Sequence, residues 1–321
     1  MESDNFGSIR GRLRGLVPPL CTIRRADGSL WPDMQCRLLD LVAPHVDAIF
    51  VSGTTGLCPW LSLDKQKTLI EMALSYVDEQ GLDTPVICAA LGNTATEVAE
   101  RSQSLRDAGA AAVVVYTPYF FRHTDEELVR FFTDLAGQAE DVPFVLYNLP
   151  QMTQNNISPD IVRQVVDACG NYVAVKDSKG DAEQFRNLLP LRHRLNVLNG
   201  DEEISRDVLS EADGCVPAAA NVFPLLWREV LESAKDRSDW ERHHPLIMKV
   251  KREVYGLPDM PQVITGILTA LEMLGIGAGP TPPFLPFDKI APGRGMKASV
   301  ANVLRELREY IPEPFRAQAL S

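Results

Sequence analysis

The 321-residue sequence lacks any continuous run of about 18 apolar residues, the length that a membrane-crossing helix needs. Residues 1–15 are polar and contain no apolar core of the kind found in secretory signal peptides. We therefore expect no membrane partner and a cytoplasmic protein.

Several signatures of metal and nucleotide sites are also missing. The five histidines form no H-E-x-x-H arrangement, and the six cysteines are scattered without a C-x-x-C pair, so neither a zinc site nor a disulfide framework is expected. No P-loop is present, and the glycine-rich residues 275–279 follow a helical pattern rather than a strand, unlike a dinucleotide-binding loop. The sequence predicts no metal site.

Basic residues are outnumbered, because 32 Lys and Arg stand against 43 Asp and Glu for a formal net charge of −11. Such a surface repels phosphate backbones, so we expect no nucleic-acid partner. A pocket can still be locally positive, which leaves room for an anionic small substrate. The 45% apolar and 23% charged residues are typical of a globular protein with a large core.

Eight short apolar segments alternate with helical patterns along most of the chain. Their interiors are solidly apolar, which is typical of parallel strands buried on both faces. The predicted strands are residues 15–22, 47–52, 84–91, 111–116, 142–148, 172–176, 195–199 and 214–218.

Eight strand–helix units fit an α/β fold of the (β/α)8 TIM barrel type, with a doubly wound open sheet as the competing layout. The open sheet favours a glycine-rich phosphate loop after its first strand, whereas residues 18–22 here are Pro-Pro-Leu-Cys-Thr. The sequence thus favours the barrel, formed by residues 14–235. Residues 236–315 are predicted to be additional C-terminal helices packed on it.

Helix start signals are clear between the strands. Thr124 with Glu127 forms a capping box, and Ser158 followed by Pro159 is typical of an N-cap and first helical position. Ser62 opens another helix. After the eighth strand, helices are predicted over residues 222–234, 239–255, 261–274 and 292–310, with a Gly/Pro-rich connector over 275–286.

Polar residues at the carboxyl ends of barrel strands are the candidates for catalysis. Lys176 ends the sixth apolar segment, where burial favours the neutral, nucleophilic amine that forms a Schiff base with a ketone. The alternative is a structural strand-end lysine paired with Asp177 or another carboxylate. Tyr147 ends the neighbouring fifth segment, and it is either a core aromatic or a proton carrier beside Lys176.

Two further strand ends are candidate substrate-binding sites. Gly53-Thr54-Thr55-Gly56 is either a tight turn or a carboxylate cradle, in which hydroxyls and backbone N–H groups converge on an anion. Gly200 follows the seventh segment and borders the expected pocket. Residues 201–203 (Asp-Glu-Glu) then begin a predicted helix, either as helix-capping residues or as groups that recognise substrate hydroxyls.

In this order, the strand-end motifs resemble those of the dihydrodipicolinate synthase and N-acetylneuraminate lyase superfamily of pyruvate-dependent class I aldolases. The resemblance runs from about residue 16 to about residue 288. It implies a (β/α)8 barrel with C-terminal helices, no cofactor beyond a covalent lysine Schiff base, and a homotetramer. The motifs that carry it are Gly53-Thr54-Thr55-Gly56, Thr117-Pro118-Tyr119-Phe120, Tyr147-Asn148-Leu149-Pro150, Val175-Lys176-Asp177-Ser178, and Gly214-Cys215-Val216 with Ala220-Asn221-Val222.

The resemblance also implies roles by position. Lys176 matches the lysine that forms a Schiff base with pyruvate, and Tyr147 matches the tyrosine that relays protons. Thr54 matches the threonine that is hydrogen-bonded to that tyrosine. Thr55 matches the group that holds the pyruvate carboxylate, and Val216 matches a backbone position lining the pyruvate pocket.

Two positions depart from the pattern of the superfamily. Met152 stands where synthases of the lysine pathway usually have an arginine for the second substrate's carboxylate, which disfavours that activity. Phe120 stands where many members have a tyrosine that is supplied across a subunit interface to complete a proton relay. The relay here is then shorter, or it uses water or another group.

The sequence around Leu57 and the Pro-rich residues 282–286 are similar to 2-keto-3-deoxygluconate aldolases. The resemblance therefore favours cleavage of a 2-keto-3-deoxy sugar acid to pyruvate and an aldehyde, or its formation from them. Arg122 and His123 are candidates for contacting the distal end of the acid. The alternatives are a dehydratase or hydratase-aldolase acting on another 2-oxo acid, a dihydrodipicolinate synthase-like enzyme, and a non-catalytic pyruvate-binding protein.

Overall fold

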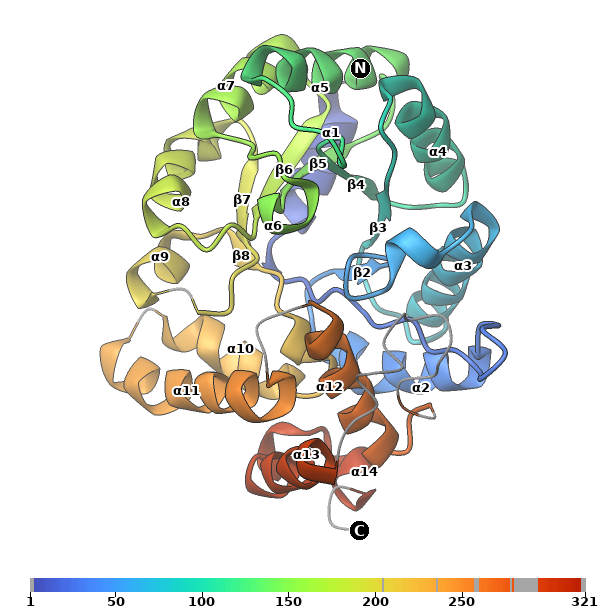
Figure 1. The fold of residues 1–321 in the computed structure, drawn as a ribbon, viewed down its shortest axis with the longest axis vertical. Coiled ribbons are helices and arrows are strands. Elements are labelled where there is room, and N and C mark those ends of the chain that lie inside the picture. Colours follow the sequence, from blue (N-terminus) through green and yellow to red (C-terminus); the bar gives the residue numbers. More distant parts are fainter. Residues whose placement is uncertain are drawn as a thin grey trace.

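The computed structural model of the protein describes residues 3–203, 205–234, 236–256, 260–277, 279 and 294–318. Its centre is a curled sheet of eight parallel strands in the order β1-β8-β7-β6-β5-β4-β3-β2 (Figure 1). All eight predicted strands are confirmed: β1 (Gly15–Leu16), β2 (Ile49–Val51), β3 (Val86–Ala90), β4 (Ala112–Tyr116), β5 (Phe144–Asn148), β6 (Tyr172–Asp177), β7 (Asn196–Asn199) and β8 (Gly214–Cys215).

The two edges of this sheet are joined by the segment that follows β1. The backbone N–H of Leu20 donates to Phe50 O at 2.8 Å, and the N–H of Phe50 donates to Pro18 O at 3.2 Å. Pro19 and Phe50 form a parallel bridge. Because β1 also pairs with β8, the sheet curls round until its edges meet.

The first and eighth strands are shorter than the predicted 15–22 and 214–218, and those predicted ends were wrong. Pro18 and Pro19, just after β1, have no N–H to donate to a neighbouring strand. Pro217, just after β8, lacks this donor as well. Proline at these positions stops the regular pairing although the chain continues in the same direction.

A helix follows each strand, and these helices surround the sheet (Figure 1). The predicted N-caps are confirmed: Ser62 Oγ accepts from Lys65 N, Ser158 Oγ from Ile161 N, and Thr124 and Glu127 complete the capping box. In chain order the helices are α2 (Pro32–Val42), α3 (Leu63–Glu79), α4 (Ala95–Asp107), α5 (Asp125–Gln138), α7 (Pro159–Ala168), α8 (Ala182–Leu188), α9 (Arg206–Glu211) and α10 (Pro224–Ser233), with a short α6 (Pro150–Thr153) before α7.

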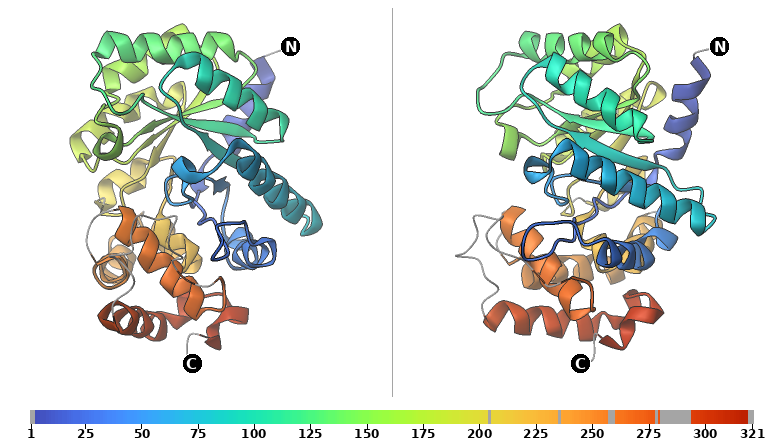
Figure 2. Two further views of the ribbon diagram at one scale, coloured as in Figure 1. Left: turned by 45° about the vertical axis from the view of Figure 1, so that its right-hand side comes forward. Right: turned by 90° about the vertical axis from the view of Figure 1, so that its right-hand side faces the viewer.

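Both faces of the strands are buried, as the solidly apolar segments predict. In β4, Val113 and Val115 pack in the cluster shared with the surrounding helices, whereas Ala112, Val114 and Tyr116 belong to the cluster inside the curled sheet. Helix α1 (Ser3–Arg12) lies at one side of the molecule, and its Ile9 packs with this inner cluster (Figure 2).

The remaining helices gather beside α10, away from α5 and α7 (Figures 1 and 2). They are α11 (Arg237–Val250), which continues into a π-helical turn (Lys251–Tyr255), α12 (Met260–Met273), α13 (Arg294–Glu306) and α14 (Glu313–Arg316). The helices predicted in this region are confirmed with small shifts of their ends. Residues 278, 280–286 and 292–293, which belong to the predicted connector and last helix, lie outside the described residues. Of the helices described, none combines the length and apolarity needed to cross a membrane.

Candidate active site

Lys176 and Tyr147 lie side by side at the carboxyl ends of adjacent strands. They are register partners in the β5–β6 pair, and their side chains are 5% and 4% exposed. Lys176 Nζ lies 3.9 Å from the centroid of the Tyr147 ring and 5.4 Å from that of Phe50. The amine is therefore held against the face of the Tyr147 ring and close to that of Phe50.

The side chains of Lys176 and Asp177 point to opposite faces of the sheet, because successive side chains of a strand alternate. Asp177 therefore forms its hydrogen bonds with other groups. Asp177 Oδ1 accepts hydrogen bonds from Asn148 Nδ2 at 2.8 Å and from the N–H of Lys179 at 3.1 Å. Burial raises the pKa of the Asp177 carboxyl, although the bond from Asn148 opposes this. The structural interpretation of Lys176 as a partner of Asp177 thus finds no support in these contacts.

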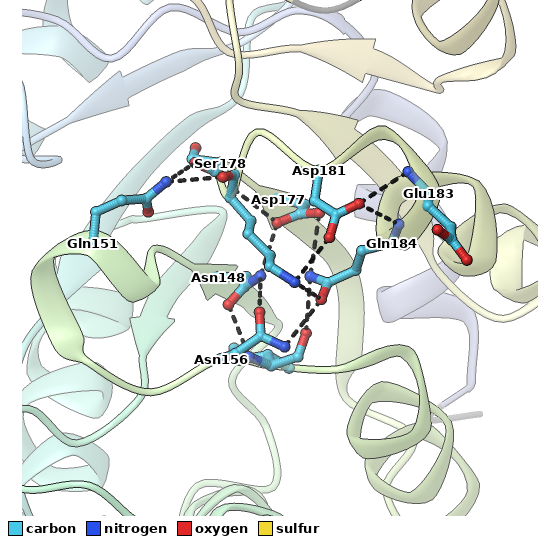
Figure 3. A network of polar contacts seen from close by, with 10 residues as sticks. Asn148, Gln151, Asn156, Asp177, Ser178, Asp181, Glu183 and Gln184 are labelled. Atoms are coloured by element: carbon cyan, nitrogen blue, oxygen red, sulfur yellow. Dashed lines mark hydrogen bonds and ion pairs between the residues drawn. The ribbon is translucent and has the colours of Figure 1, made fainter. Parts of the chain in front are cut away.

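The network around Asp177 ties together the two strand ends that carry Tyr147 and Lys176 (Figure 3). Asn148 Oδ1 accepts from the N–H of Ile157 at 2.8 Å, while its Nδ2 reaches Asn156 Oδ1 at 3.1 Å as well as Asp177. Gln151 Nε2 donates to the carbonyl oxygen of Ser178 at 3.0 Å. These bonds fix the register of β5 and β6 at the site.

The Tyr147 hydroxyl is easier to ionise than an ordinary phenol. Burial alone raises its pKa, but the positive charge of Lys176 and polar interactions with Lys176, Ser178 and Thr54 outweigh burial and lower the pKa from its usual value. A phenol that exchanges its proton readily beside an amine is suited to general acid–base catalysis.

The hydroxyl of Thr54 lies 3.1 Å from the Oη of Tyr116, a residue that the sequence analysis did not single out. Tyr116 ends β4 and is the register partner of Tyr147, and the two ring centroids are 4.7 Å apart. The strand-end rule could have identified Tyr116, because it follows an apolar run just as Tyr147 does.

The Gly53–Gly56 turn is closely fitted to its neighbours. A Cβ on Gly53 would lie 2.9 Å from the Phe50 ring, and one on Gly56 would lie 2.7 Å from Leu20 O. The flanking Ser52 and Leu57 have positive φ angles of 49° and 66°. Side chains larger than hydrogen are therefore excluded at both glycines, and Thr55 is directed to the cavity described next.

A cavity of about 590 Å³ opens at this end of the sheet. It brings together five of the predicted site residues: Thr55, Tyr147, Lys176, Gly200 and Val216. Gly53 and Thr54 are not among the residues that line it, and Thr54 lies behind the wall, against Tyr116. Gly200 is packed closely, since a Cβ there would lie 2.0 Å from Ser178 Oγ and 2.9 Å from Lys176 Cε.

The outer part of the cavity is lined by residues 201–203 and by the helices after β8, with Lys251, Arg252 and Tyr255 among them. The helix predicted at residue 201 is wrong: α9 begins at Arg206. Asn199 and Asp201 instead form side-chain turns, with Asn199 Oδ1 accepting from the N–H of Asp201 at 3.0 Å.

Glu202 is a half-buried acid in this wall, and its packing depends on a contact that the sequence did not predict. Its carboxylate accepts from Tyr255 Oη at 2.8 Å and from the N–H of Ala219 at 3.1 Å. Burial raises the pKa of Glu202, although these bonds oppose the rise. The acid thereby joins the wall of the cavity to the C-terminal helices.

Arg122 and His123 do not reach this cavity. Arg122 is exposed, and the N–H of His123 donates to Asn155 Oδ1 at 2.8 Å. Phe120 is 73% exposed on the same loop, with a φ of 84°. Among the residues that the structure describes, no group of three or more His, Cys, Asp or Glu is placed to hold a metal ion.

Comparisons with known proteins agree with this geometry. Residues 12–298 match the dihydrodipicolinate synthetase family. The putative 2-dehydro-3-deoxy-D-gluconate aldolase YagE of Escherichia coli (strain K12) is 27% identical over 304 residues, or 92% of this chain and 97% of that protein. A 4-hydroxy-tetrahydrodipicolinate synthase of Methanothrix thermoacetophila is 30% identical over 83% of this chain and 89% of its own length.

Solved structures show the same fold. The crystal structure of YagE in complex with pyruvate superposes with a TM-score of 0.80 at 26% identity, covering 92% of this chain and 99% of that one. A dihydrodipicolinate synthase of Bacteroides thetaiotaomicron gives a TM-score of 0.80 at 26% identity, over 92% and 98%. The protein is thus a carbon–carbon lyase that works through a covalent lysine–pyruvate Schiff base without an external cofactor. The chain belongs to the dihydrodipicolinate synthetase family.

Proposed function

We propose that the protein is an aldolase that cleaves a 2-keto-3-deoxy sugar acid to pyruvate and an aldehyde, or forms the acid from them. The observation that carries the proposal is the buried amine of Lys176, 3.9 Å from the Tyr147 ring, at the inner end of a cavity of about 590 Å³. This cavity is larger than pyruvate alone requires, which leaves room for the second product.

In the first stage, the neutral amine of Lys176 attacks the C2 carbonyl carbon of the 2-oxo acid. One amine proton and one proton from the Tyr147 hydroxyl leave with the carbonyl oxygen as water. A protonated imine on Lys176 and a phenolate on Tyr147 result. The pKa of Tyr147, which lies below that of an ordinary phenol, supports this proton donation.

In the second stage, the Tyr147 phenolate removes the proton of the C4 hydroxyl. The C3–C4 bond breaks, its electron pair flows to the imine nitrogen, and C4 leaves as the aldehyde. Tyr147 then returns the proton to C3 of the enamine. Hydrolysis by one water frees pyruvate and the Lys176 amine, with the released proton going to the phenolate.

The carboxylate end of the substrate belongs at the Gly53–Gly56 turn in this proposal. Thr55 binds the carboxylate with its hydroxyl and backbone N–H, and Gly53 allows the turn to lie against the Phe50 ring. Thr54 supports Tyr147 from behind the wall. Val216 lines the pyruvate pocket, and Gly200 leaves the space into which Lys176 extends.

The choice of a sugar acid rests on the outer part of the cavity. Met152 lies in its wall and offers no guanidinium for a second carboxylate, which disfavours the synthase activity named for several relatives. Asp201, Glu203 and Lys251 line the same region and can bond to substrate hydroxyls. The relative from E. coli that matches over 92% of the chain carries the name of such an aldolase.

The proposal extends to the whole molecule. Residues 14–235 form a closed (β/α)8 barrel that carries the site, and residues 236–315 form a helical extension packed on it. The protein assembles as a homotetramer, which light scattering of the purified protein tests directly.

Borohydride trapping with pyruvate, followed by peptide mass spectrometry, tests the chemistry. A reduced pyruvate adduct on Lys176 is expected, and no adduct on any lysine of the folded protein would overturn the proposal. A screen of 2-keto-3-deoxy sugar acids then separates cleavage, which releases pyruvate and an aldehyde, from water loss. Water loss without aldehyde would favour a dehydratase, and binding of pyruvate without turnover would favour a non-catalytic protein.

A further inference from the structure

We infer that Tyr116 is a positioning residue for Tyr147, because its hydroxyl holds the Thr54 hydroxyl within the same chain. Phe120 cannot take this role, since its side chain has no hydroxyl. The inference rests on the proposed proton-carrying role of Tyr147. It adds Tyr116 to the residues proposed for that reaction.

The first step of the argument is geometric. Tyr116 and Tyr147 are register partners on β4 and β5, and their ring centroids lie 4.7 Å apart with planes inclined by 46°. Tyr116 Oη lies 3.1 Å from Thr54 Oγ1, and Tyr116 is only 5% exposed. The Thr54 hydroxyl is also among the groups that lower the pKa of the Tyr147 phenol. Thr54 is thus the common neighbour of two buried phenols.

The second step concerns the direction of the hydrogen bonds. Burial raises the pKa of Tyr116 well above that of an ordinary phenol, so this hydroxyl keeps its proton at any pH where the protein works. A buried O–H group needs an acceptor, and Thr54 Oγ1 is within reach. When Tyr116 donates to Thr54, the single proton of Thr54 is directed to Tyr147, whose phenolate it stabilises.

The third step explains why the hydroxyl must come from Tyr116. Phe120 has no hydroxyl, and its ring is 73% exposed on a loop outside the sheet, where it packs edge-on against Phe121 at 4.9 Å. Tyr116 occupies the interior of the curled sheet instead. The set Tyr116–Thr54–Tyr147 therefore uses side chains of one protomer.

The decisive experiment is a pH titration in which near-ultraviolet absorbance reports the ionisation of Tyr147. The component that disappears in Tyr147→Phe belongs to Tyr147. In Tyr116→Phe we expect this component to move up by about 0.5–1 pH unit, because hydrogen-bonded chains strengthen one another and Thr54 loses its donor. At pH values below the pKa of Tyr147, we expect the rate of pyruvate trapping in Tyr116→Phe to be about 3- to 10-fold lower than in the wild type.

A matched control separates this role from general packing. Tyr172→Phe removes another buried hydroxyl of the sheet, which donates to Phe132 O at 2.7 Å, and it should leave the Tyr147 titration unchanged. Thr54→Val should reproduce the shift of Tyr116→Phe. The double variant Tyr116→Phe/Thr54→Val should then show no further shift, since Tyr116 acts through Thr54.

Three outcomes would overturn the inference: an unchanged Tyr147 titration in Tyr116→Phe, an equal shift in Tyr172→Phe, or additive shifts in the double variant. The titration needs no substrate. If the wild-type protein forms no pyruvate adduct, the proposed function fails while the titration still decides whether Tyr116 tunes Tyr147.

Discussion

Replacing Gly200 with alanine tests how closely the site is built around Lys176. The added methyl carbon would lie 2.0 Å from Ser178 Oγ and 2.9 Å from Lys176 Cε. Ordinary contacts between such atoms are about 3.5 Å or longer, so the serine oxygen moves by more than ~1 Å and the lysine chain by ~0.5–1 Å. A misplacement of about 1 Å at a reacting group lowers its rate by about 100-fold.

The same geometry predicts a small effect on stability. The two closest atoms are near the ends of side chains that can rotate away, and the nearest backbone atom, Asp177 O, is 3.2 Å from the new carbon. We expect a loss of about 1 kcal/mol, or two to four degrees in Tm. Gly200→Ala therefore separates catalysis from folding.

The assay is the rate of borohydride trapping of pyruvate on Lys176, together with thermal melting by circular dichroism. Gly170→Ala is the control, because a Cβ on Gly170 has no atom within 4 Å. Adding Ser178→Ala to Gly200→Ala removes the closest contact and should restore part of the rate. Trapping within twofold of the wild-type rate in Gly200→Ala would refute the reasoning, and a collapsed Tm would assign Gly200 to the fold instead.

Three further substitutions address the chemistry and the fold. Lys176→Ala should abolish the adduct and turnover while keeping the circular dichroism spectrum, because a strand-end side chain in the cavity supports little core; an adduct on another lysine would contradict this. Tyr147→Phe should slow cleavage by about 10²–10⁴ through loss of the proton carrier, and wild-type rates would remove Tyr147 from the mechanism. Gly214→Ala should destabilise the fold by about 2–3 kcal/mol in urea melts, because its Cβ would lie 2.4 Å from Gly15 O, a backbone atom that cannot rotate away. Gly137→Ala, with no atom within 4 Å, is its control and should melt within about 1 kcal/mol of the wild type.

Much of the architecture could be predicted from local patterns. The Ala112–Tyr116 segment and residues 144–147 are apolar because both faces of a strand in a helix-covered sheet are buried. Capping groups such as Thr124 and Glu127 bond to residues only a few positions away, so the sequence pattern predicts them directly. The predicted lengths of β1 and β8 are wrong because Pro18 and Pro217 lack the N–H that regular pairing needs, although the apolar segments continue past them.

Local pattern is enough to make Lys176 and Tyr147 neighbours, since each ends one of two consecutive parallel strands and such ends share one edge of the sheet. Two contacts require the folded chain: Tyr116 Oη lies 3.1 Å from Thr54, 62 positions away, and Glu202 bonds to Tyr255 in the helices beyond β8. Those contacts depend on how the sheet curls and on where the last helices pack. No local pattern encodes either of these, because both follow from the packing of the whole chain.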